Sequence, residues 1–147
     1  MSNPILAPIQ LDKLYIIDSF FHIESEPASN MDIKLDVSCE TVQEQIRDDS
    51  GELEIRLNVI SKLVDADNDK NVKLTAKVSV QAKATSPLPQ NMDTEDRKRY
   101  LYSNTIGLAY SHAKSYILEM TALSPMGAMI LPAILPGEMA SQIKLSD

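Results

Sequence analysis

The sequence predicts an α+β fold, in which a four-stranded antiparallel sheet packs against one long helix. Residues 9–84 hold one stretch rich in β-branched and aromatic residues and three stretches where apolar and polar residues alternate, as in strands. Residues 93–120 repeat their apolar residues at three- and four-residue steps, as in a helix. We therefore expect one domain, with its core over residues 9–136 and a short tail over 137–147.

The expected helix is much longer than an ordinary globular helix. Asp93 and Thr94 can cap its free N–H groups, and Glu95 and Asp96 then lie at the positive end of its dipole. At about 1.5 Å per residue it would run roughly 40 Å, so it needs a wide surface to pack on. Its apolar stripe consists of Tyr102, Ile106, Ala109, Ala113, Ile117 and Met120.

The four strands are expected over residues 9–24, 31–38, 52–64 and 72–84, with an acidic loop over 39–51. The first strand is apolar on both faces, which is typical of a strand covered on both, by its own helix and by a partner. With strict alternation, one face carries Leu14, Ile16 and Phe20, and the other carries Tyr15, Ile17, Phe21 and Ile23. The positions expected to be buried between sheet and helix include Leu35, Leu57, Val78 and Ile117.

The net charge of −7 argues against general nucleic-acid binding, which depends on neutralising phosphates with basic groups. The charge is uneven along the chain. Residues 12–69 carry 15 acidic and 5 basic groups, a net of −10, whereas residues 70–114 carry 3 acidic and 8 basic groups, a net of +5. Two interpretations stay open: an acidic surface that docks a basic partner, or internal pairing of the two regions across the sheet.

Composition also indicates the compartment. Cys39 is the only cysteine, so no intrachain disulfide can form, which fits a reducing environment. The first residues lack the basic-then-apolar pattern of a signal peptide, and no run of about 18 apolar residues exists to span a membrane. We expect a cytoplasmic protein without membrane insertion.

No catalytic or metal-binding motif is visible. His22 and His112 are the only histidines, and neither has a motif around it. The turn at residues 65–69 imitates the start of a calcium loop, but Lys70 stands where glycine is needed and Ala76 where glutamate is needed. We therefore expect no enzyme activity, no metal and no cofactor.

The end of the helix and the segment after it are rich in methionine. Such flexible, polarisable side chains are typical of adaptable binding surfaces, although they also fill cores. Pro132 and Pro136 lack backbone donors, so this segment should pack by its side chains and not by ladder bonds. The methionines are Met120, Met126, Met129 and Met139.

Several stretches resemble the SecB family of protein-export chaperones, in the right order and over most of residues 9–136. They are LYIIDSFFH at 14–22, IKLDV at 33–37, the alternating strands at 52–64 and 72–84, and AYSHAKSYILEMTALSPMGAMILPAIL at 109–135. The resemblance implies a homo-oligomer, a dimer of dimers with first strands and helices at the interfaces. It also implies apolar grooves that hold non-native polypeptide, and an acidic sheet surface that docks the SecA motor.

The resemblance assigns roles to particular residues. Asp18 matches one acidic docking position and Glu24 lies near a second, whereas Lys77 replaces a third acid. Two functions stay open. One is a holdase for unfolded chains, which could serve in protein export. The other is a SecB-fold adaptor or structural protein with one dedicated partner, either phage-encoded or tied to a toxin–antitoxin pair. The residues expected to frame the polypeptide groove are Phe20, Phe21, Met126, Met129, Ile130, Leu131, Ile134 and Leu135.

Overall fold

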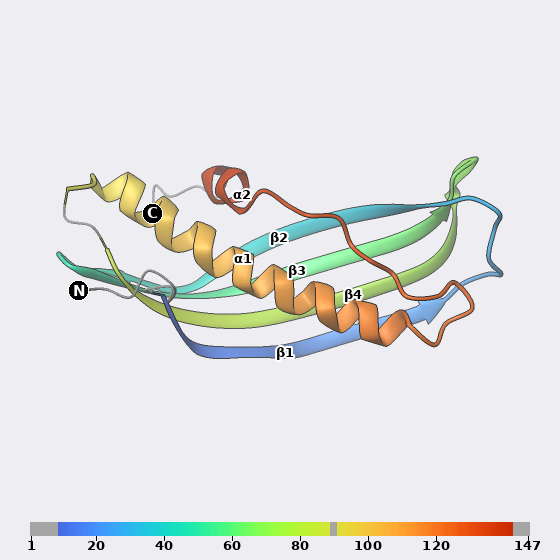
Figure 1. The fold of residues 1–147 in the computed structure, drawn as a ribbon, viewed down its shortest axis with the longest axis horizontal. Helices are drawn as coiled ribbons and strands as arrows, with labels where there is room; N and C mark the ends of the chain where they lie inside the picture. Colours follow the sequence, from blue (N-terminus) through green and yellow to red (C-terminus); the bar gives the residue numbers. More distant parts are fainter. Residues whose placement is uncertain (1–8, 89–90, 143–147) are drawn as a thin grey trace.

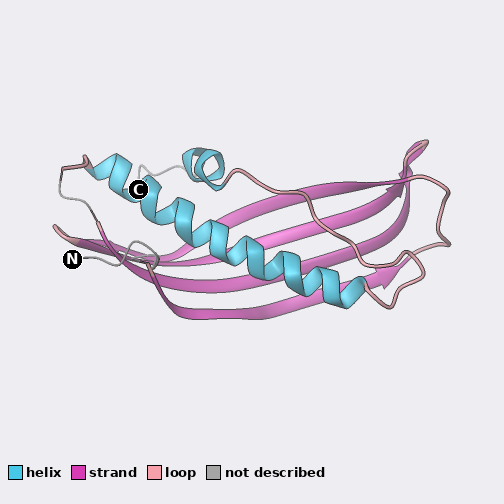
Figure 2. Ribbon diagram, in the orientation of Figure 1, coloured by secondary structure: helices cyan, strands magenta, loops and turns pink. Residues whose placement is uncertain are grey.

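The protein folds as one sheet with one long helix lying across it, seen here in a computed structural model that describes residues 9–88 and 91–142. The strands form an antiparallel sheet in the order β1-β4-β3-β2. Figures 1 and 2 show the long, curved sheet as one layer and the helices as the other, which confirms the predicted α+β architecture. Residues 143–147 of the expected tail lie outside the described residues. The elements are β1 (Gln10–Ile23), β2 (Met31–Ile46), β3 (Ser50–Asp65), β4 (Asn68–Pro87), α1 (Thr94–Thr121) and α2 (Pro136–Gln142).

β2 is twice as long as its alternating pattern indicated. The strand predicted to end at residue 38, followed by an acidic loop over 39–51, continues to Ile46, which pairs with Gly51 of β3. A register shift between Thr41 and Gln43 marks a bulge, which breaks the alternation. Because β2 is an edge strand, its second half can carry polar residues and still pair, so the acidic loop was a wrong interpretation.

β1 also contains a bulge, and it changes which side chains face the helix. The register against β4 shifts between Ile16 and Asp18. Beyond this point Phe21, and not Phe20, lies with Leu14 and Ile16 on the helix side, packed against the core. Strict alternation therefore placed the two phenylalanines on the wrong faces.

The core lies between α1 and the two central strands. Leu57, Val78 and Ile117 are buried as predicted, with at most 2% of their surface exposed. Leu35 is only half-buried, because it lies on the edge strand and not beneath α1. The central strands therefore supply most of the apolar burial, and β2 contributes less.

Some of the acidic groups of residues 12–69 pair with basic groups of residues 70–114 across the sheet. On the face away from α1, Lys83 of β4 lies 2.8 Å from the Glu52 carboxylate of β3. This hydrogen bond and the charge of Glu52 raise the pKa of Lys83 above its usual value. The pair supports the interpretation that the basic and acidic regions meet across the sheet.

α1 begins where the sequence predicted. The Asp93 carboxylate accepts a hydrogen bond of 2.8 Å from the backbone N–H of Asp96, and so caps the first turn. The predicted stripe faces the sheet, with its first five residues buried and Met120 half-buried. Gly107 leaves room on the other side, since a Cβ built there would lie 3.6 Å from Pro136 at the start of α2.

Polar contacts set the direction in which α1 crosses the sheet. The Tyr102 hydroxyl lies 2.7 Å from both the Glu44 carboxylate and the Thr41 hydroxyl, in the second half of β2. Near the other end, the Tyr116 hydroxyl lies 3.1 Å from the Ser19 hydroxyl of β1. α1 therefore runs diagonally from β2 to β1 (Figure 1), and it does not cover the first half of β2.

We predict that Tyr102→Phe lowers the unfolding free energy by about 0.5–1.5 kcal/mol at neutral pH, the usual net contribution of a hydrogen bond. Burial, together with the bond to Glu44, raises the pKa of Tyr102 in the folded protein. The contribution of the protonated Tyr102 hydroxyl to folding stability is therefore complete below the pKa of an unfolded tyrosine, about 10, and is lost as the pH rises above it. Urea denaturation from about pH 7 to about pH 11 should show a shallower alkaline loss for Tyr102→Phe than for the wild type. Equal alkaline losses in the two proteins would contradict this role.

Candidate functional site

The segment that joins α1 to α2, residues 122–135, is called the strap. It runs back beside α1 over the helix-side face of the sheet (Figure 1) and has no regular secondary structure. Met129 and Leu131 are buried, with 4% and 1% of their surfaces exposed, whereas Ile130 and Leu135 are 64% and 65% exposed. At residues 129–131 the strap thus has buried and exposed side chains in alternation, as a strand would, but no strand within residues 9–88 and 91–142 pairs with it.

The middle of the strap is held by side chains and, among the described residues, by two hydrogen bonds. The Thr121 hydroxyl accepts a hydrogen bond of 2.7 Å from the backbone N–H of Met129, and the Tyr110 hydroxyl donates to the carbonyl of Pro132. Among residues 9–88 and 91–142, no backbone hydrogen bond joins the strap to β2. Pro132 and Pro136 have no N–H to offer, which agrees with the expectation that this segment packs by side chains.

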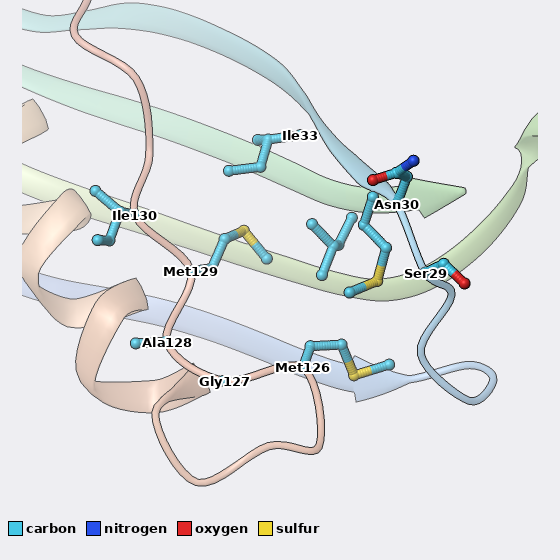
Figure 3. Close-up of a pocket in the computed structure, with 10 residues that line it drawn as sticks. Ser29, Asn30, Ile33, Met126, Gly127, Ala128, Met129 and Ile130 are labelled. Atoms are coloured by element: carbon cyan, nitrogen blue, oxygen red, sulfur yellow. The ribbon is translucent and has the colours of Figure 1, made fainter. Parts of the chain in front are cut away.

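A pocket of about 370 Å³ lies between the strap and the beginning of β2. Figure 3 shows Met126 and Met129 on the strap side of the pocket, with Ile33 of β2 and the loop residues Ser29 and Asn30 on the other side. We call this pocket the strap groove. Its lining residues are Ser29, Asn30, Met31, Ile33, Leu63, Met126, Gly127, Ala128, Met129 and Ile130.

The strap groove is suited to apolar side chains of varied shape. Three of its lining residues, Met31, Met126 and Met129, carry flexible thioether side chains that repack easily. Met129 is anchored in the core, whereas Met126 and Met31 are half-buried and Ile130 is exposed. Its volume lies at the lower end of the range for ligand pockets, roughly 300–1,000 Å³. The described lining residues include no acid or base, and the Ser29 hydroxyl is their one potential nucleophile.

Acidic side chains lie on the face of β2 opposite the groove. Asp32, Asp36 and Glu40 project as exposed side chains from the other face of β2. Lys34, between them, lies 2.6 Å from the Asp69 carboxylate, and this hydrogen bond holds the pKa of Asp69 below its usual value. Lys62 of β3, opposite Lys34 in the register, is also exposed on this face, so acidic and basic groups are interspersed there.

The predicted groove residues divide into two groups. The structure brings Met126, Met129 and Ile130 together in the strap groove. Leu131 is buried, while Ile134 is half-buried and Leu135 is exposed farther along the strap.

The two phenylalanines lie outside the strap groove. Phe21 is half-buried on the helix side of β1 and packs against the core. Phe20 lies on the opposite face, 50% exposed, with the Lys77 ammonium 5.6 Å from the centre of its ring. Phe21 thus packs against the same core as Met126 and Met129 without lining the strap groove, whereas Phe20 lies on the other face of the sheet.

The two predicted docking acids lie on the face of the sheet away from α1. Asp18 is exposed and pairs with Ser79 across the sheet. The Glu24 carboxylate accepts a hydrogen bond of 2.7 Å from the Thr75 hydroxyl. Docking of the SecA motor on this face stays a prediction.

Sequence reasoning missed the strand side of the groove. Met31 and Ile33 were expected to face inward from β2, and they do, but nothing in their pattern says which segment covers them. Ser29 and Asn30, in the loop before β2, and Leu63 of β3 complete that wall. A contact between residues nearly a hundred positions apart leaves no local signal in the sequence.

The described part of the chain also bears on three other features: a metal site, a reactive cysteine and a membrane-spanning helix. No group of three His, Cys, Asp or Glu residues there is placed to hold a metal ion. Burial raises the pKa of the Cys39 thiol to about 12, which keeps it in its unreactive, protonated form. No helix within residues 9–88 and 91–142 is both long and apolar enough to cross a membrane.

Comparison with solved structures identifies the fold. A SecB-like chaperone of Mycobacterium tuberculosis, in complex with a ChAD peptide from an antitoxin, has a TM-score of 0.64 at 13% identity, over 86% of this chain and 90% of that chain. A protein of unknown function from Streptococcus agalactiae has a TM-score of 0.49 at 9% identity, over 85% of this chain and 97% of that chain. No protein-family model matches the sequence, and no curated protein matches it. The first comparison shows that the chain has a SecB-like fold, as the resemblance predicted.

Proposed function

We propose that this protein is a chaperone that holds non-native polypeptide, with the strap groove as its binding site. The observation that carries the proposal is the methionine-lined pocket of about 370 Å³ between β2 and the strap, a segment that no backbone ladder ties to β2 among the described residues. Unfolded chains expose apolar side chains of many shapes. A groove lined by flexible methionine side chains, beneath a strap held by few hydrogen bonds, can adapt its shape to different apolar side chains.

The strap is also suited to yield to a bound chain. Besides the buried side chains of Met129 and Leu131, two hydrogen bonds made by Thr121 and Tyr110 hold its middle. Each such bond contributes only about 0.5–1.5 kcal/mol. Ile130 and Leu135 already lie at the surface and extend the apolar area beside the groove.

The relative of known structure supports binding of polypeptide and raises a second candidate function. That SecB-like chaperone is bound to a peptide from an antitoxin, which is one defined partner. The alternative for this chain is an adaptor or structural protein with one dedicated partner, toxin–antitoxin-linked or phage-encoded. The breadth of clients separates the two functions. A cytoplasmic location and a role in export through SecA stay predictions.

We predict that wild-type protein suppresses aggregation of several unrelated, chemically unfolded proteins, and that Met126→Ser with Ile130→Ser weakens this at least about tenfold. Each apolar side chain contributes about 1.5–3 kcal/mol when fully buried, so losing two contacts should be clearly measurable. Light scattering of the aggregating client at increasing chaperone concentration measures the effect. Leu123→Ser is the matched control, because Leu123 is 99% exposed on the strap and lies outside the groove.

Two results would count against the proposal. If the wild type fails with every unrelated client, the general holdase function is wrong and the dedicated-adaptor function replaces it. If the double variant suppresses aggregation as well as Leu123→Ser does, the strap groove is not the site. Circular dichroism and thermal unfolding of each variant show whether it remains folded.

We further propose that the protein forms a homo-oligomer, dimer or tetramer, through β1. This strand is at the edge of the sheet, and Tyr15, Ile17 and Phe20 on it are 45%, 38% and 50% exposed. A free edge with exposed aromatic and β-branched residues aggregates unless another chain covers it. A second copy with the same edge would cover it by a two-fold symmetric contact.

We predict that multi-angle light scattering at tens of micromolar protein finds a dimer or a larger species. Tyr15→Lys with Phe20→Lys should shift the mass toward the monomer, because burying two ammonium groups in the contact is costly. Val42→Lys, at a residue 49% exposed on the opposite edge strand, should leave the mass unchanged. A monomeric wild type would overturn the proposed assembly.

A further inference from the structure

The backbone of β2 offers free hydrogen-bonding groups along its outer edge, and their positions follow from one contact. The Ala66 N–H donates to the Asn30 carbonyl at 2.9 Å, just beyond the pair formed by Met31 and Asp65. In an antiparallel ladder, hydrogen-bonded and non-hydrogen-bonded pairs alternate. Up to the bulge, the even-numbered residues of β2 therefore bond to β3, and the odd-numbered residues direct their N–H and C=O groups to the free edge.

The same odd-numbered residues carry the apolar side chains of β2. Ile33, Leu35 and Val37 are half-buried on the helix side, and Met31 and Ile33 line the strap groove. Within residues 9–88 and 91–142, no backbone group of another element bonds to this edge. Free backbone groups and an apolar groove thus lie side by side on one stretch of strand.

We propose that an extended segment of client polypeptide adds to the sheet as a further strand along residues 31–37, with alternate apolar side chains entering the strap groove. This inference rests on the proposed holdase function and specifies how that function is carried out. Main-chain hydrogen bonds would supply affinity that does not depend on client sequence, and the groove would supply the preference for apolar residues.

The charged residues of β2 determine which side chains fit on the other face of the client segment, away from the groove. An added strand would place its residues closest to the even-numbered residues of β2, at Cα distances of about 4.5 Å in the non-hydrogen-bonded pairs. Asp32 and Asp36 are exposed there, and Lys34 between them is paired with Asp69. Lys62 is exposed opposite Lys34, but it lies on β3, on the other side of β2 from the added strand. Opposite charges stabilise such cross-strand pairs. The fitting segment therefore has apolar residues at alternate positions on one face and basic residues four positions apart on the other.

Amide hydrogen exchange followed by NMR tests the edge directly. The free protein should protect the amides of Asp32, Lys34 and Asp36, whereas the amides of the odd-numbered residues should exchange fast. The probe is a synthetic peptide of about nine residues in which leucine alternates with threonine or lysine, with its lysines four positions apart. Saturating peptide, or an unfolded client protein, should slow exchange at Ile33 and Leu35 at least about tenfold, the effect of a new hydrogen bond. A peptide with glutamate in place of lysine should bind at least about tenfold more weakly.

A comparison of Leu35→Pro with Leu35→Ala tests whether the outward backbone N–H of residue 35 bonds to the peptide. Proline at this odd-numbered position removes an N–H that bonds to nothing in β3, and edge strands tolerate it. Both variants lose the leucine side chain, but only Leu35→Pro loses the outward donor. Peptide affinity should fall about tenfold further in Leu35→Pro than in Leu35→Ala, on the scale of one lost hydrogen bond.

The outcomes separate this inference from the function it rests on. If peptide or client binds while the amides of Ile33 and Leu35 still exchange fast, strand addition is overturned and the holdase function stands. Equal peptide affinities of folded Leu35→Pro and Leu35→Ala would overturn it in the same way. If Leu35→Pro does not fold, exchange in the wild type decides alone. If neither peptide nor unfolded protein binds, the proposed function itself fails.

Discussion

The hydrogen bond between the Tyr102 hydroxyl and the Glu44 carboxylate, 2.7 Å long, fixes the N-terminal half of α1 over the second half of β2. Lys98 adds an ion pair to the same carboxylate at 3.1 Å. Because α1 is a single helix of 28 residues, fixing one end over β2 sends the other end across to β1. The first half of β2 then lies outside the cover of α1, and in the described part of the chain the strap alone shields it.

The strap can shield that half-strand only in part. Its prolines remove backbone donors, so it packs through Met129 and Leu131 and leaves the backbone edge of β2 unpaired among the described residues. The stability of the fold lies elsewhere, in the fully buried residues of β3, β4 and α1. The edge of β2 and the exposed side chains of the strap therefore contribute little to the core, although Met129 and Leu131 belong to it, and binding regions are commonly drawn from the less stable parts of a fold.

Much of this fold could be predicted from the sequence, but the site only in part. β3 and β4 are central strands with buried, alternating side chains, so their phase was predicted correctly. The bulges in β1 and β2 shift that phase through backbone geometry, which the pattern of residue types does not show, and so Phe20 and Phe21 were misplaced. Met126, Met129 and Ile130 were found from composition, whereas Met31 and Ile33 were missed as their partners because strap and β2 meet only in three dimensions.

We propose that non-native polypeptide binds between the strap and the first half of β2. Methyl-labelled methionine and isoleucine, followed by NMR while an unfolded protein that cannot refold is added, test this claim most directly. We predict chemical-shift changes at Met126, Ile130 and Ile33, which line the strap groove. Ile60 on the opposite face of the sheet and Met92 before α1 should stay unchanged. Changes confined to Ile60 or Met92, with none at the strap groove, would contradict it.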